Sequence, residues 1–328
     1  MADVIVLGSN SFSGAHFVDY CLDKGMDVVG ISRSIEPIEA FLPYRWQKRA
    51  GSFKFCAKDL NKDLDDIVHI MRENKPSYVV NFAAQGMVAQ SWDNPRHWLH
   101  TNTVSPVLLH DELRRLPGLK RFVQISTPEV YGNCEGVVTE NRNYLPSTPY
   151  AVSKAAVDMS LHSFFKAYQF PVLYTRAANV YGEGQQLYRI ITRSIMSIKL
   201  GIKLPLHGGG VSERNFIHID DVAAATYMIM MNGDIGDIYH ISSESVVSIR
   251  GLVEMICQRM GCDFDDAVHI TGERLGKDAL YHLSNEKLKN LGWSPSIGLE
   301  QGVDRVIAWV EKYFDELKGQ ALDYQHKP

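Results

Sequence analysis

The chain has 328 residues, a formal net charge of −4 and a pI near 6.3, with 45% hydrophobic and 22% charged residues. This composition suits one large globular domain or two closely joined ones, and its acidic balance argues against nucleic acid or an anionic membrane as the main partner. Five scattered cysteines, no basic leader and no apolar run of membrane length favour a cytoplasmic protein. The twelve histidines lack ligand spacing, so we expect no metal site.

Short β-branched runs alternate with helical segments in the first half of the chain. We expect strands at residues 3–7, 27–32, 53–56, 78–83, 121–127 and 171–176. This alternation predicts an α/β fold, a Rossmann-type doubly wound parallel sheet with helices on both faces. Such sheets bind their ligands at the carboxyl ends of the strands, where we expect the functional residues.

The alternation loosens after residue 178. A glycine-rich turn precedes an expected strand at 216–219 and a helix from Asp220, and amphipathic helices are expected near 249–260 and 299–317. The expected domains are a cofactor-binding domain (residues 1–178, with a returning segment near 212–242) and a smaller substrate-binding lobe (residues 179–211 and 243–328). We expect the polar tail, residues 324–328, to be disordered.

The turn after the first expected strand, Gly8 to Gly14, has glycines at the first and last positions of a Gly-x-x-Gly-x-x-Gly pattern. Ser11 replaces the middle glycine. Amides at the N-terminus of the next helix can cradle a pyrophosphate, so this turn is predicted to bind a dinucleotide. Considered alone, the same sequence could equally form an ordinary tight turn that binds no dinucleotide. The residues assigned to cofactor binding here are Gly8, Ser11, Phe12, Ser13 and Gly14.

The second strand ends at Ser32 and Arg33, where an acidic residue would bind the ribose 2′-hydroxyl of NAD. A cation flanked by hydroxyls suits a 2′-phosphate, so we expect NADP. NAD is the alternative if Arg33 is only a solvated side chain. Asp59 and Leu60, just past the third strand, are expected to cover the adenine, although a helix-capping role explains Asp59 almost as well.

Tyr150 and Lys154 form the most informative pair of residues in the chain. On a helix these positions share one face, so the ammonium can stand beside the phenol and make it a base usable near neutral pH. Two other Tyr-x-x-x-Lys patterns occur, but only Tyr150 opens a helix after a proline-rich turn. The preceding strand delivers Thr127 and Glu129 to the same region, which predicts a redox site.

Further motifs follow in a fixed order. They are 81–88 with 91–92, 101–102, 176–182, 214–221, and 273–278 with 291–295. With the first turn and the Tyr150/Lys154 pair, they resemble the extended short-chain dehydrogenases, and within them the nucleotide-sugar 4,6-dehydratases that act on dTDP-glucose or GDP-mannose. The resemblance runs over nearly the whole chain.

The resemblance implies which residues bind the ligands. Further cofactor contacts are expected from Ala83, Ala84, Asn102, Tyr150, Lys154, Ala177 and Val180. Contacts with a nucleotide-diphosphate sugar are expected from Gln85, Asn179, Arg214 and Arg274. The resemblance also implies a homodimer through the helix after Pro106 and the helix from Tyr150, because both carry apolar positions that a second copy could bury. These positions are Val107, Leu108, Val157 and Leu161.

The resemblance further implies the chemistry. Tyr150 would remove the proton of the sugar 4-hydroxyl while the C4 hydride passes to the nicotinamide, with Lys154 holding the ribose and lowering the tyrosine pKa. Thr127 would hydrogen-bond the reacting oxygen. Glu129 would take the C5 proton, water would leave from C6, and the hydride would return there to give a 4-keto-6-deoxy sugar. Simple epimerases resemble the chain elsewhere but usually lack a carboxylate at this position.

One position departs from the family pattern. Where the dTDP-glucose enzymes have Asp and the GDP-mannose enzymes have Ser, this chain has Pro128, which can donate no proton. An epimerase, a 5,6-dehydratase and a UDP-glucuronate decarboxylase therefore stay open as alternatives. A more remote alternative is a non-catalytic NADP-sensing protein on the same fold. The nucleotide base and the sugar of the substrate are not identified by the sequence.

Overall fold

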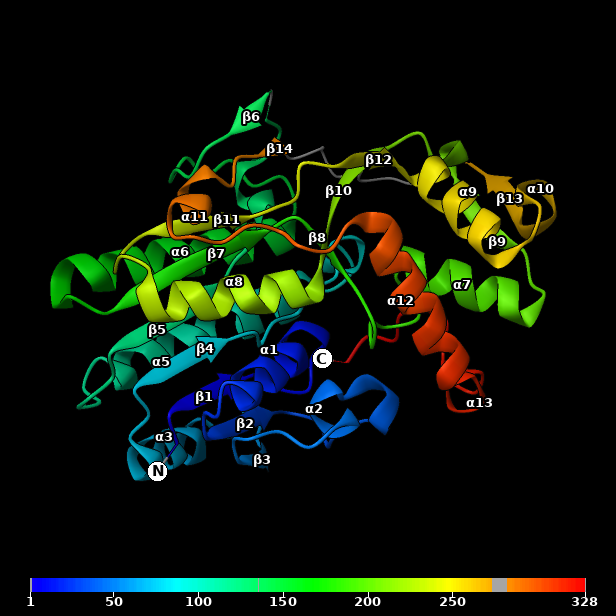
Figure 1. Ribbon diagram of the computed structural model, residues 1–328. Coiled ribbons are helices and arrows are strands. Elements are labelled where there is room, and N and C mark those ends of the chain that lie inside the picture. Colours follow the sequence, from blue (N-terminus) through cyan, green and yellow to red (C-terminus); the bar gives the residue numbers. More distant parts are fainter. Residues whose placement is uncertain (1, 135, 273–281, 328) are drawn as a thin grey trace.

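A computed structural model of the chain describes residues 2–134, 136–272 and 282–327 (Figure 1). Its centre is a seven-stranded sheet of order β11-β7-β5-β4-β1-β2-β3, in which every neighbouring pair is parallel. The strands are β1 (Val4–Leu7), β2 (Val28–Ser32), β3 (Phe53–Ala57), β4 (Tyr78–Asn81), β5 (Arg121–Ile125), β7 (Val172–Ala177) and β11 (Ile238–Ile241). The predicted doubly wound parallel sheet is confirmed, and β11 extends it by an unpredicted strand.

Alternate residues of each central strand face opposite cores. Val4 and Val6 of β1 pack with two helices on one face of the sheet, whereas Ile5 and Leu7 pack with three helices on the other. Because strand side chains alternate, a single apolar run supplies both cores. The first pair of helices is α1 (Phe12–Asp23) and α8 (Ile219–Asn232), and the second set is α3 (Leu64–Asn74), α5 (Ser105–Leu113) and α6 (Pro149–Tyr168).

The same packing corrects part of the expected dimer surface. Val157 and Leu161 of α6 are fully buried against the sheet within this chain, so they cannot contact a second copy. Val152 and Met159, on the outward side of the helix, are exposed instead. The expectation was wrong for Val157 and Leu161 because apolar character alone does not say which side of an amphipathic helix faces its own core.

A smaller lobe lies to one side of the main sheet (Figure 1). Its strands are β8 (Asn179–Tyr181), β10 (Glu213–His218) and β12 (Val246–Ser248), with a separate parallel pair of β9 (Leu204–His207) and β13 (Val268–Thr271). Its helices are α7 (Ile190–Leu200), α9 (Ile249–Met260), α10 (Phe264–Ala267), α12 (Leu299–Lys312) and α13 (Phe314–Leu317). The expected helix near 299–317 is therefore interrupted at Tyr313.

Short elements complete the described chain. They are α2 (Pro43–Trp46), α4 (Pro95–Leu99), a π-helical stretch (His100–Val104), α11 (Glu286–Asn290) and the parallel pair β6 (Val137–Val138) with β14 (His282–Leu283), together with 3₁₀ turns at Glu39–Phe41, Ala89–Ser91, Pro128–Tyr131 and Gly208–Gly210. The expected returning segment is shared between the two parts, because β10 pairs with β8 and β12 whereas α8 and β11 belong to the main sheet and its cover.

A polar network fastens the smaller lobe to the main sheet. Glu183, just after β8, accepts hydrogen bonds from Arg305 of α12 at 2.7 Å and contacts His218 at 3.0 Å. Its carbonyl oxygen lies 2.8 Å from the ring of His16 on α1. Arg305 also donates to Asp220 at 2.6 Å. Burial raises the pKa of Glu183, but His218 and Arg305 together hold it below its ordinary value. The two lobes are thus joined by partly buried charge pairing as well as apolar packing.

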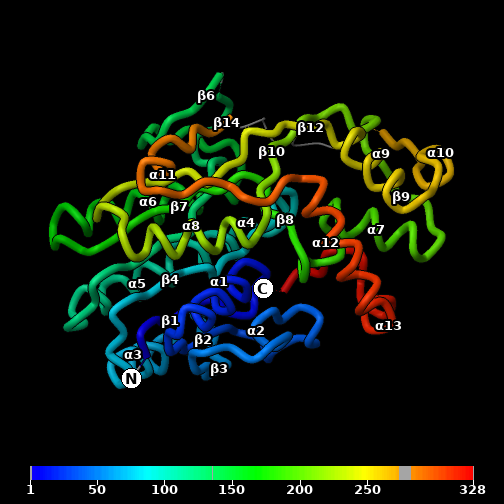
Figure 2. Tube along the Cα trace, in the orientation of Figure 1, coloured from blue at the N-terminus to red at the C-terminus, as the bar shows by residue number. Residues whose placement is uncertain are grey.

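The tail that was expected to be disordered is ordered through Lys327. After α13 the chain turns back toward α1, as the red end of the trace shows (Figure 2). Tyr324 packs edge-on against Tyr188, and His326 stacks on Trp98 with ring centroids 5.1 Å apart. The expectation was wrong because two aromatic rings in an otherwise polar segment find partners that are distant in sequence.

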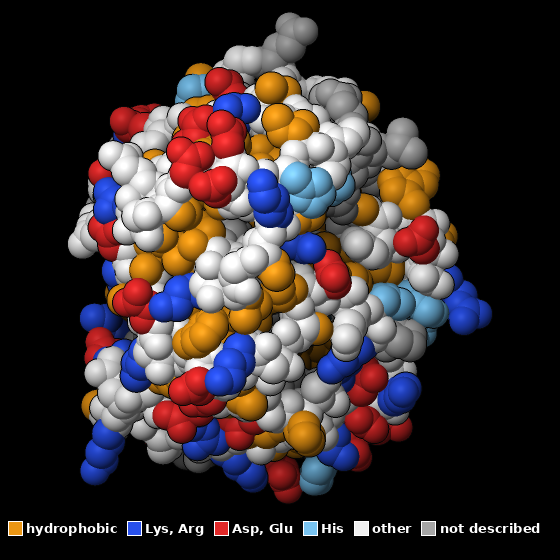
Figure 3. Space-filling model, turned by 90° about the vertical axis from the view of Figure 1, so that its right-hand side faces the viewer, with side chains coloured by type: hydrophobic (Ala, Val, Ile, Leu, Met, Phe, Trp, Pro, Cys, Tyr) orange, Lys and Arg blue, Asp and Glu red, His pale blue; other side chains and the backbone are white. Residues whose placement is uncertain are grey.

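The face of the smaller lobe carries acidic and basic side chains interspersed with apolar ones (Figure 3). Some of these charges pair between helices, as Arg259 of α9 does with Glu300 and Asp304 of α12. Within the described ranges, no helix has both the length and the apolar character that crossing a bilayer requires.

Candidate active site

The end of β5 and the start of α6 bring the predicted catalytic residues together. Thr127 caps the 3₁₀ turn Pro128–Tyr131, accepting a hydrogen bond from the amide of Glu129 at 3.3 Å. Thr148 caps α6, accepting from the amide of Ala151 at 3.1 Å, and Pro149 occupies the first helical position. These local signals fix where the helix starts and place Tyr150 in its first turn.

Tyr150 hydrogen-bonds Thr127 and lies within the electrostatic influence of Glu129. Its pKa is raised, first by burial and then by the negative charge of Glu129, while a hydrogen bond with Thr127 acts in the opposite direction. The Glu129 carboxylate therefore lies within electrostatic range of the phenol. Arg189, which precedes α7, also lowers the pKa of Tyr150 and was not among the predicted residues. No motif marked it, because its position depends on how the smaller lobe folds back.

Lys154 lies one turn further along α6 and is only 3% exposed. Its ammonium donates a hydrogen bond to the carbonyl oxygen of Ile125 at 2.6 Å, and burial lowers its pKa to about 8. A lysine with this pKa is still mostly protonated at pH 7. The sequence predicted that this ammonium lowers the pKa of Tyr150. In the structure the largest effect on the Tyr150 pKa is burial, which raises it.

A buried ion pair supports the same region and was missed by sequence reasoning. Asp158, four residues after Lys154, accepts from Ser126 at 2.6 Å and from Arg176 at 3.0 Å, and the side chains of both Asp158 and Arg176 are fully buried. Ser126 directly precedes Thr127. Asp158 thus ties together α6, the end of β5 and the end of β7. The sequence signal that could have identified Asp158 is its helical spacing of four residues from Lys154.

The turn at the start of α1 has the close backbone packing expected of a dinucleotide cradle. Gly8 has φ +75°, and a Cβ there would lie 2.6 Å from the amide nitrogen of Ala83. A Cβ on Gly14 would lie 2.1 Å from the carbonyl oxygen of Gly8. Ser11 has a structural role where the pattern has its middle glycine. Its hydroxyl donates to the carbonyl oxygen of Gly8 at 2.6 Å and accepts from the amide of Gly14 at 3.2 Å. It therefore caps α1. Phe12 and Ser13 begin the helix.

Ser32 and Arg33 differ in their surroundings at the end of β2. The Ser32 hydroxyl is buried and accepts from the amide of Asn10 at 3.1 Å, so it points toward the first turn. Arg33 is exposed beside it. Glu36, the nearest acidic residue downstream, is paired with Arg45 at 2.8 Å. The strand end thus presents an exposed cation and no acidic side chain at positions 32 to 34.

The residues expected near the adenine and ribose lie just after the ends of β3 and β4. Asp59 accepts from the amide of Asn61 at 2.9 Å, so its side chain stabilises its own turn, and Leu60 is buried beside it. Ala83 and Ala84 follow β4, and Ala84 is exposed at that edge.

Asn102 is 2% exposed and donates to the Ser153 hydroxyl at 2.9 Å, while it exchanges two hydrogen bonds with the backbone of Gln85. Its side chain therefore braces the loop after β4 against α6. Ala177 ends β7, and Val180 lies in β8.

The residues expected to bind the sugar nucleotide are more dispersed. Asn179 is exposed and donates to the carbonyl oxygen of Asn215 at 3.1 Å. Arg214 on β10 donates to the backbone of Glu213 at 2.7 Å. Gln85 is only 3% exposed, because its amide donates to the carbonyl oxygen of Lys327 at 2.7 Å. Arg274 lies outside the described residues.

A cleft of about 640 Å³ lies beside the first turn. Its walls include Asn10 and Phe12 from the N-terminal end of α1, the segment 34–38 after β2, and the segment 186–188 that precedes α7. A further wall comes from residues of the tail. A cleft of this size at the carboxyl edge of a parallel sheet suits a dinucleotide. Within the described ranges, no group of three or more His, Cys, Asp and Glu residues is arranged to hold a metal ion.

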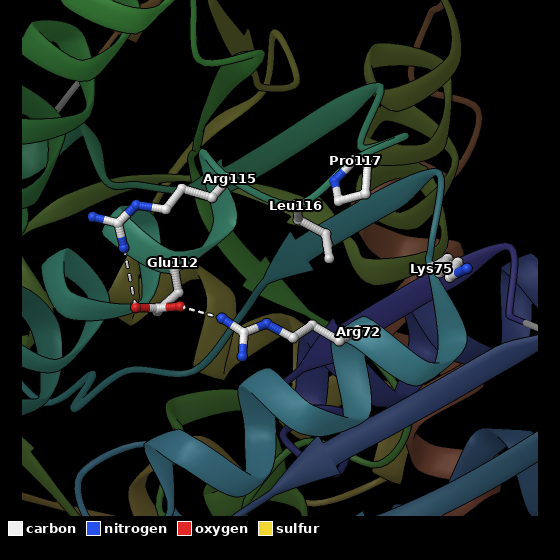
Figure 4. A pocket seen from close by; sticks show the side chains of 6 residues that line it. All are labelled: Arg72, Lys75, Glu112, Arg115, Leu116 and Pro117. Atoms are coloured by element: carbon white, nitrogen blue, oxygen red, sulfur yellow. Dashed lines mark hydrogen bonds and ion pairs between the residues drawn. The ribbon is translucent and has the colours of Figure 1, made fainter.

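A smaller depression of about 190 Å³ lies at the opposite edge of the sheet (Figure 4). Glu112 stands between Arg72 at 2.7 Å and Arg115 at 3.2 Å. The lining residues Lys75 and Pro117 shortly precede β4 and β5, so the depression adjoins the amino ends of these strands. Its carboxylate is already paired with two arginines, and we assign the depression no ligand.

The sequence of this chain matches known proteins over most of its length. Residues 5–306 match the family described as GDP-mannose 4,6 dehydratase. The low-salt glycan biosynthesis protein Agl12 of Haloferax volcanii is 30% identical over 314 residues, covering 93% of this chain and 97% of that protein. A trifunctional UDP-glucose 4,6-dehydratase of Arabidopsis thaliana is 27% identical over 322 residues, covering 94% of this chain. The chain spans about half, 46%, of the length of that plant protein.

Solved structures agree with this assignment. A double mutant of the dTDP-glucose 4,6-dehydratase DesIV of Streptomyces venezuelae, solved with NAD bound, has a TM-score of 0.85 at 27% identity, covering 95% of this chain and 98% of that one. The UDP-glucose 4-epimerase of Thermotoga maritima, solved with UDP-glucose, also has a TM-score of 0.85, at 25% identity and 95% and 99% coverage. The chain therefore belongs to the GDP-mannose 4,6-dehydratase family of the extended short-chain dehydrogenases.

Proposed function

We propose that this chain is a 4,6-dehydratase that converts a nucleotide-diphosphate sugar into its 4-keto-6-deoxy form. The observation that carries the proposal is the carboxylate of Glu129, which lies close enough to Tyr150 to raise its pKa. Oxidation at C4 requires only a tyrosine, a lysine and a hydroxyl group near the cofactor. A second base beside them serves the elimination step, which sets a dehydratase apart from an enzyme that only oxidises and reduces C4.

The first turn, which adjoins the cleft, fits a nicotinamide dinucleotide. Gly8 and Gly14 stand where a side chain would collide with neighbouring backbone, and the amides at the start of α1 face a pyrophosphate site. The bound nicotinamide would accept and return the hydride, and its positive charge when oxidised would counter the raised pKa of Tyr150. We propose NADP as the preferred form, because Arg33 is exposed at the end of β2 where an acidic residue would favour NAD.

The chain's own residues then have distinct tasks. Tyr150 takes the proton of the 4-hydroxyl, and Thr127 holds the same oxygen by a hydrogen bond. Lys154, held at 2.6 Å from the Ile125 carbonyl oxygen, is oriented to donate to a ribose hydroxyl. Arg214 and Arg274 supply positive charge for the diphosphate of the substrate. Each of these assignments follows from the family motif at that position.

Elimination of water needs a proton donor, and Pro128 cannot provide one. Glu129 follows it directly in the 3₁₀ turn. We assign both proton transfers to Glu129, which takes the C5 proton as a carboxylate and then donates it to the departing C6 hydroxyl group. The proton removed from carbon leaves in the water molecule, so the elimination balances without another acid. The proton that C5 gains when the hydride returns to C6 comes from solvent.

An epimerase is the second candidate. The absence of an acid at Pro128 favours it, and a UDP-glucose 4-epimerase has the same fold. An epimerase also needs Tyr150, Lys154 and Thr127, but it has no use for a carboxylate at position 129. We further propose that the enzyme works in the cytoplasm, because all five of its cysteines are free thiols.

Mass spectrometry tests these alternatives directly. The purified protein is incubated with NADP or NAD and with pooled UDP-, dTDP- and GDP-sugars, and the nucleotide products are weighed. Loss of one water molecule supports the dehydratase, loss of carbon dioxide would indicate a decarboxylase, and conversion without a mass change would indicate an epimerase. Absence of turnover with every sugar would favour a non-catalytic protein that only binds the cofactor.

A further inference from the structure

The tail segment, residues 320–327, crosses the mouth of the cleft in an extended, alternating arrangement. From Ala321 to Lys327 the odd-numbered residues are exposed and the even-numbered ones are partly buried. Such a period of two is typical of an extended chain with one side held against the protein. The tail therefore has an anchored side and a free side.

The anchored side is held at several points on both parts of the molecule. Tyr324 packs against Tyr188 of the smaller lobe, and His326 stacks on Trp98 and lies 2.8 Å from the ring of His97 on α4. The carbonyl oxygen of Lys327 accepts from the buried Gln85 at 2.7 Å. The tail thus bridges the smaller lobe and the loop after β4, across the carboxyl edge of the sheet.

The free side of the tail faces the cleft. Asp323, Gln325 and Lys327 line it opposite Asn10, Phe12 and Ser34. Asp323 is neutralised by an ion pair with Arg193 at 2.9 Å. The pKa of the His326 imidazole is lowered by burial, by His97 and by Arg33, which puts the Arg33 guanidinium within electrostatic range of the tail. Arg33 and Lys327 thus bring positive charge near this part of the cleft, whose acidic lining residues, Glu36 and Asp323, are each held in an ion pair.

The tail bounds the cleft without filling it. About 640 Å³ stays open between the tail and the N-terminal end of α1. A segment that competes with the ligand would place its side chains in that space, whereas the bulky rings of Tyr324 and His326 point away into the protein. The arrangement is that of a wall for a ligand that lies between it and α1.

We infer that the tail segment is part of the cofactor site, in which Gln325 and Lys327 bind the phosphate groups of the dinucleotide and the tail holds the cofactor in the cleft. This inference rests on the proposed function, because it requires a dinucleotide against α1. An ammonium that reaches an anionic phosphate across a partly closed cleft both strengthens binding and slows dissociation.

The test compares the full chain with a variant that lacks residues 323–328 and with Lys327→Ala. Lys318→Ala is the matched control, because Lys318 is an exposed lysine that pairs with Asp315 beyond the cleft. Dissociation constants for NADP and NAD are measured by calorimetry, and dissociation rates by stopped-flow fluorescence. Thermal unfolding of each protein alone verifies that the variants are folded.

We expect the truncation to weaken binding of the preferred dinucleotide at least tenfold, mainly through faster dissociation, and Lys327→Ala to weaken it about three- to tenfold. Lys318→Ala should bind like the parent. Equal binding by the truncated and full chains would overturn the inference, and tighter binding by the truncated chain would show the tail to be inhibitory. If the full chain binds neither dinucleotide, the proposed function fails along with it.

Discussion

Asp158 and Arg176 form a fully buried ion pair beneath the proposed catalytic residues. Asp158→Ala should lower the free energy of unfolding by about 3–5 kcal/mol, because it leaves an uncompensated guanidinium in the core. Urea denaturation measures this loss. Asp111→Ala, which breaks an exposed ion pair with Arg114, is the control and should change stability little. A loss no larger than that of the control would contradict the buried role of Asp158.

His110 makes stability depend on pH. It is fully buried among Phe122, Phe164 and Phe170, and neither ring nitrogen has a hydrogen-bond partner among the described residues. Burial lowers its pKa from 6.5 to about 3. His110 therefore binds a proton more readily in the unfolded chain than in the folded one. The full stability of the fold is present above pH 6.5, and part of it is lost as the pH falls toward 3. The loss between pH 7 and pH 5 should be about 2 kcal/mol.

The change His110→Leu tests this. It should raise stability at pH 7 by about 1 kcal/mol by removing unpaired polar atoms, and it should remove this histidine's share of the pH dependence. Chemical denaturation at pH 7 and pH 5 gives both values. His69→Leu, on the exposed side of α3, should leave the pH dependence as it is. An unchanged pH dependence in His110→Leu would show that the ring has a partner.

Arg33 is expected to decide cofactor choice. Removing a charge-assisted contact with the 2′-phosphate in Arg33→Ala should weaken NADP binding about 10- to 100-fold and leave NAD binding unchanged. Titration of both cofactors measures this, with Lys54→Ala on β3 as the control for loss of a nearby exposed cation. Tighter binding of NAD than NADP by the parent, unaffected by Arg33→Ala, would refute the preference for NADP.

At the scale of residues, spacing predicted which groups meet but not their ionisation. Thr127, Glu129 and Tyr150 are brought together because a strand end and a helix start adjoin in this fold. Among the described residues the pKa of Tyr150 is raised, since its largest cause is burial, which depends on every element that packs around the phenol. Arg189 could not be predicted for the same reason, because the smaller lobe carries it to the site.

At the scale of elements, the outward sides of α5 and α6 predict a homodimer. Leu108 of α5 and Val152 and Met159 of α6 are 53%, 43% and 50% exposed, and Val104 just before α5 is 47% exposed. A cluster of apolar side chains on two adjacent helices suits the self-complementary interface of a symmetric dimer. Leu108, which was expected at the dimer interface, belongs to this exposed surface, whereas Val157 and Leu161 face the core.

Light scattering at micromolar concentration tests the dimer. The parent should have twice the mass of the chain, and Leu108→Glu and Met159→Glu should be monomers, because two like charges would be buried across the symmetry axis. Val211→Glu is the control, since Val211 is 67% exposed in the smaller lobe, away from both helices. A monomer mass for the parent would contradict the prediction.

Elements whose ends are set by local signals were predicted well. Elements that depend on contacts far away in the sequence were missed. The helix at 249–260 begins and ends as predicted, because Ser248 caps its start and Gly261 ends it in a left-handed conformation. β11 was missed, since a four-residue run becomes a strand only beside β7. The tail was missed because its order depends on Tyr188 and Trp98, far away in the sequence.

At the scale of the whole molecule, the site lies where the two lobes meet. The network of Glu183, His218 and Arg305 fixes the smaller lobe against α1, and the tail segment links the lobes a second time. The catalytic residues all come from the main sheet side, whereas Arg189 and Arg214 come from the smaller lobe. The proposed catalytic residues and these two arginines therefore come from different parts of the chain.

The role of Glu129 is the central claim, and Glu129→Gln tests it most directly. Hydride transfer from C4 needs Thr127, Tyr150 and Lys154, so the variant should still oxidise its substrate but lose elimination. Absorbance of reduced cofactor should then build up on the enzyme, with turnover reduced by about 10²–10⁴-fold, as is typical for loss of a general base. Glu112→Gln, at the opposite edge of the sheet, should turn over like the parent. Turnover of Glu129→Gln within about threefold of the parent, without accumulation of reduced cofactor, would contradict the account.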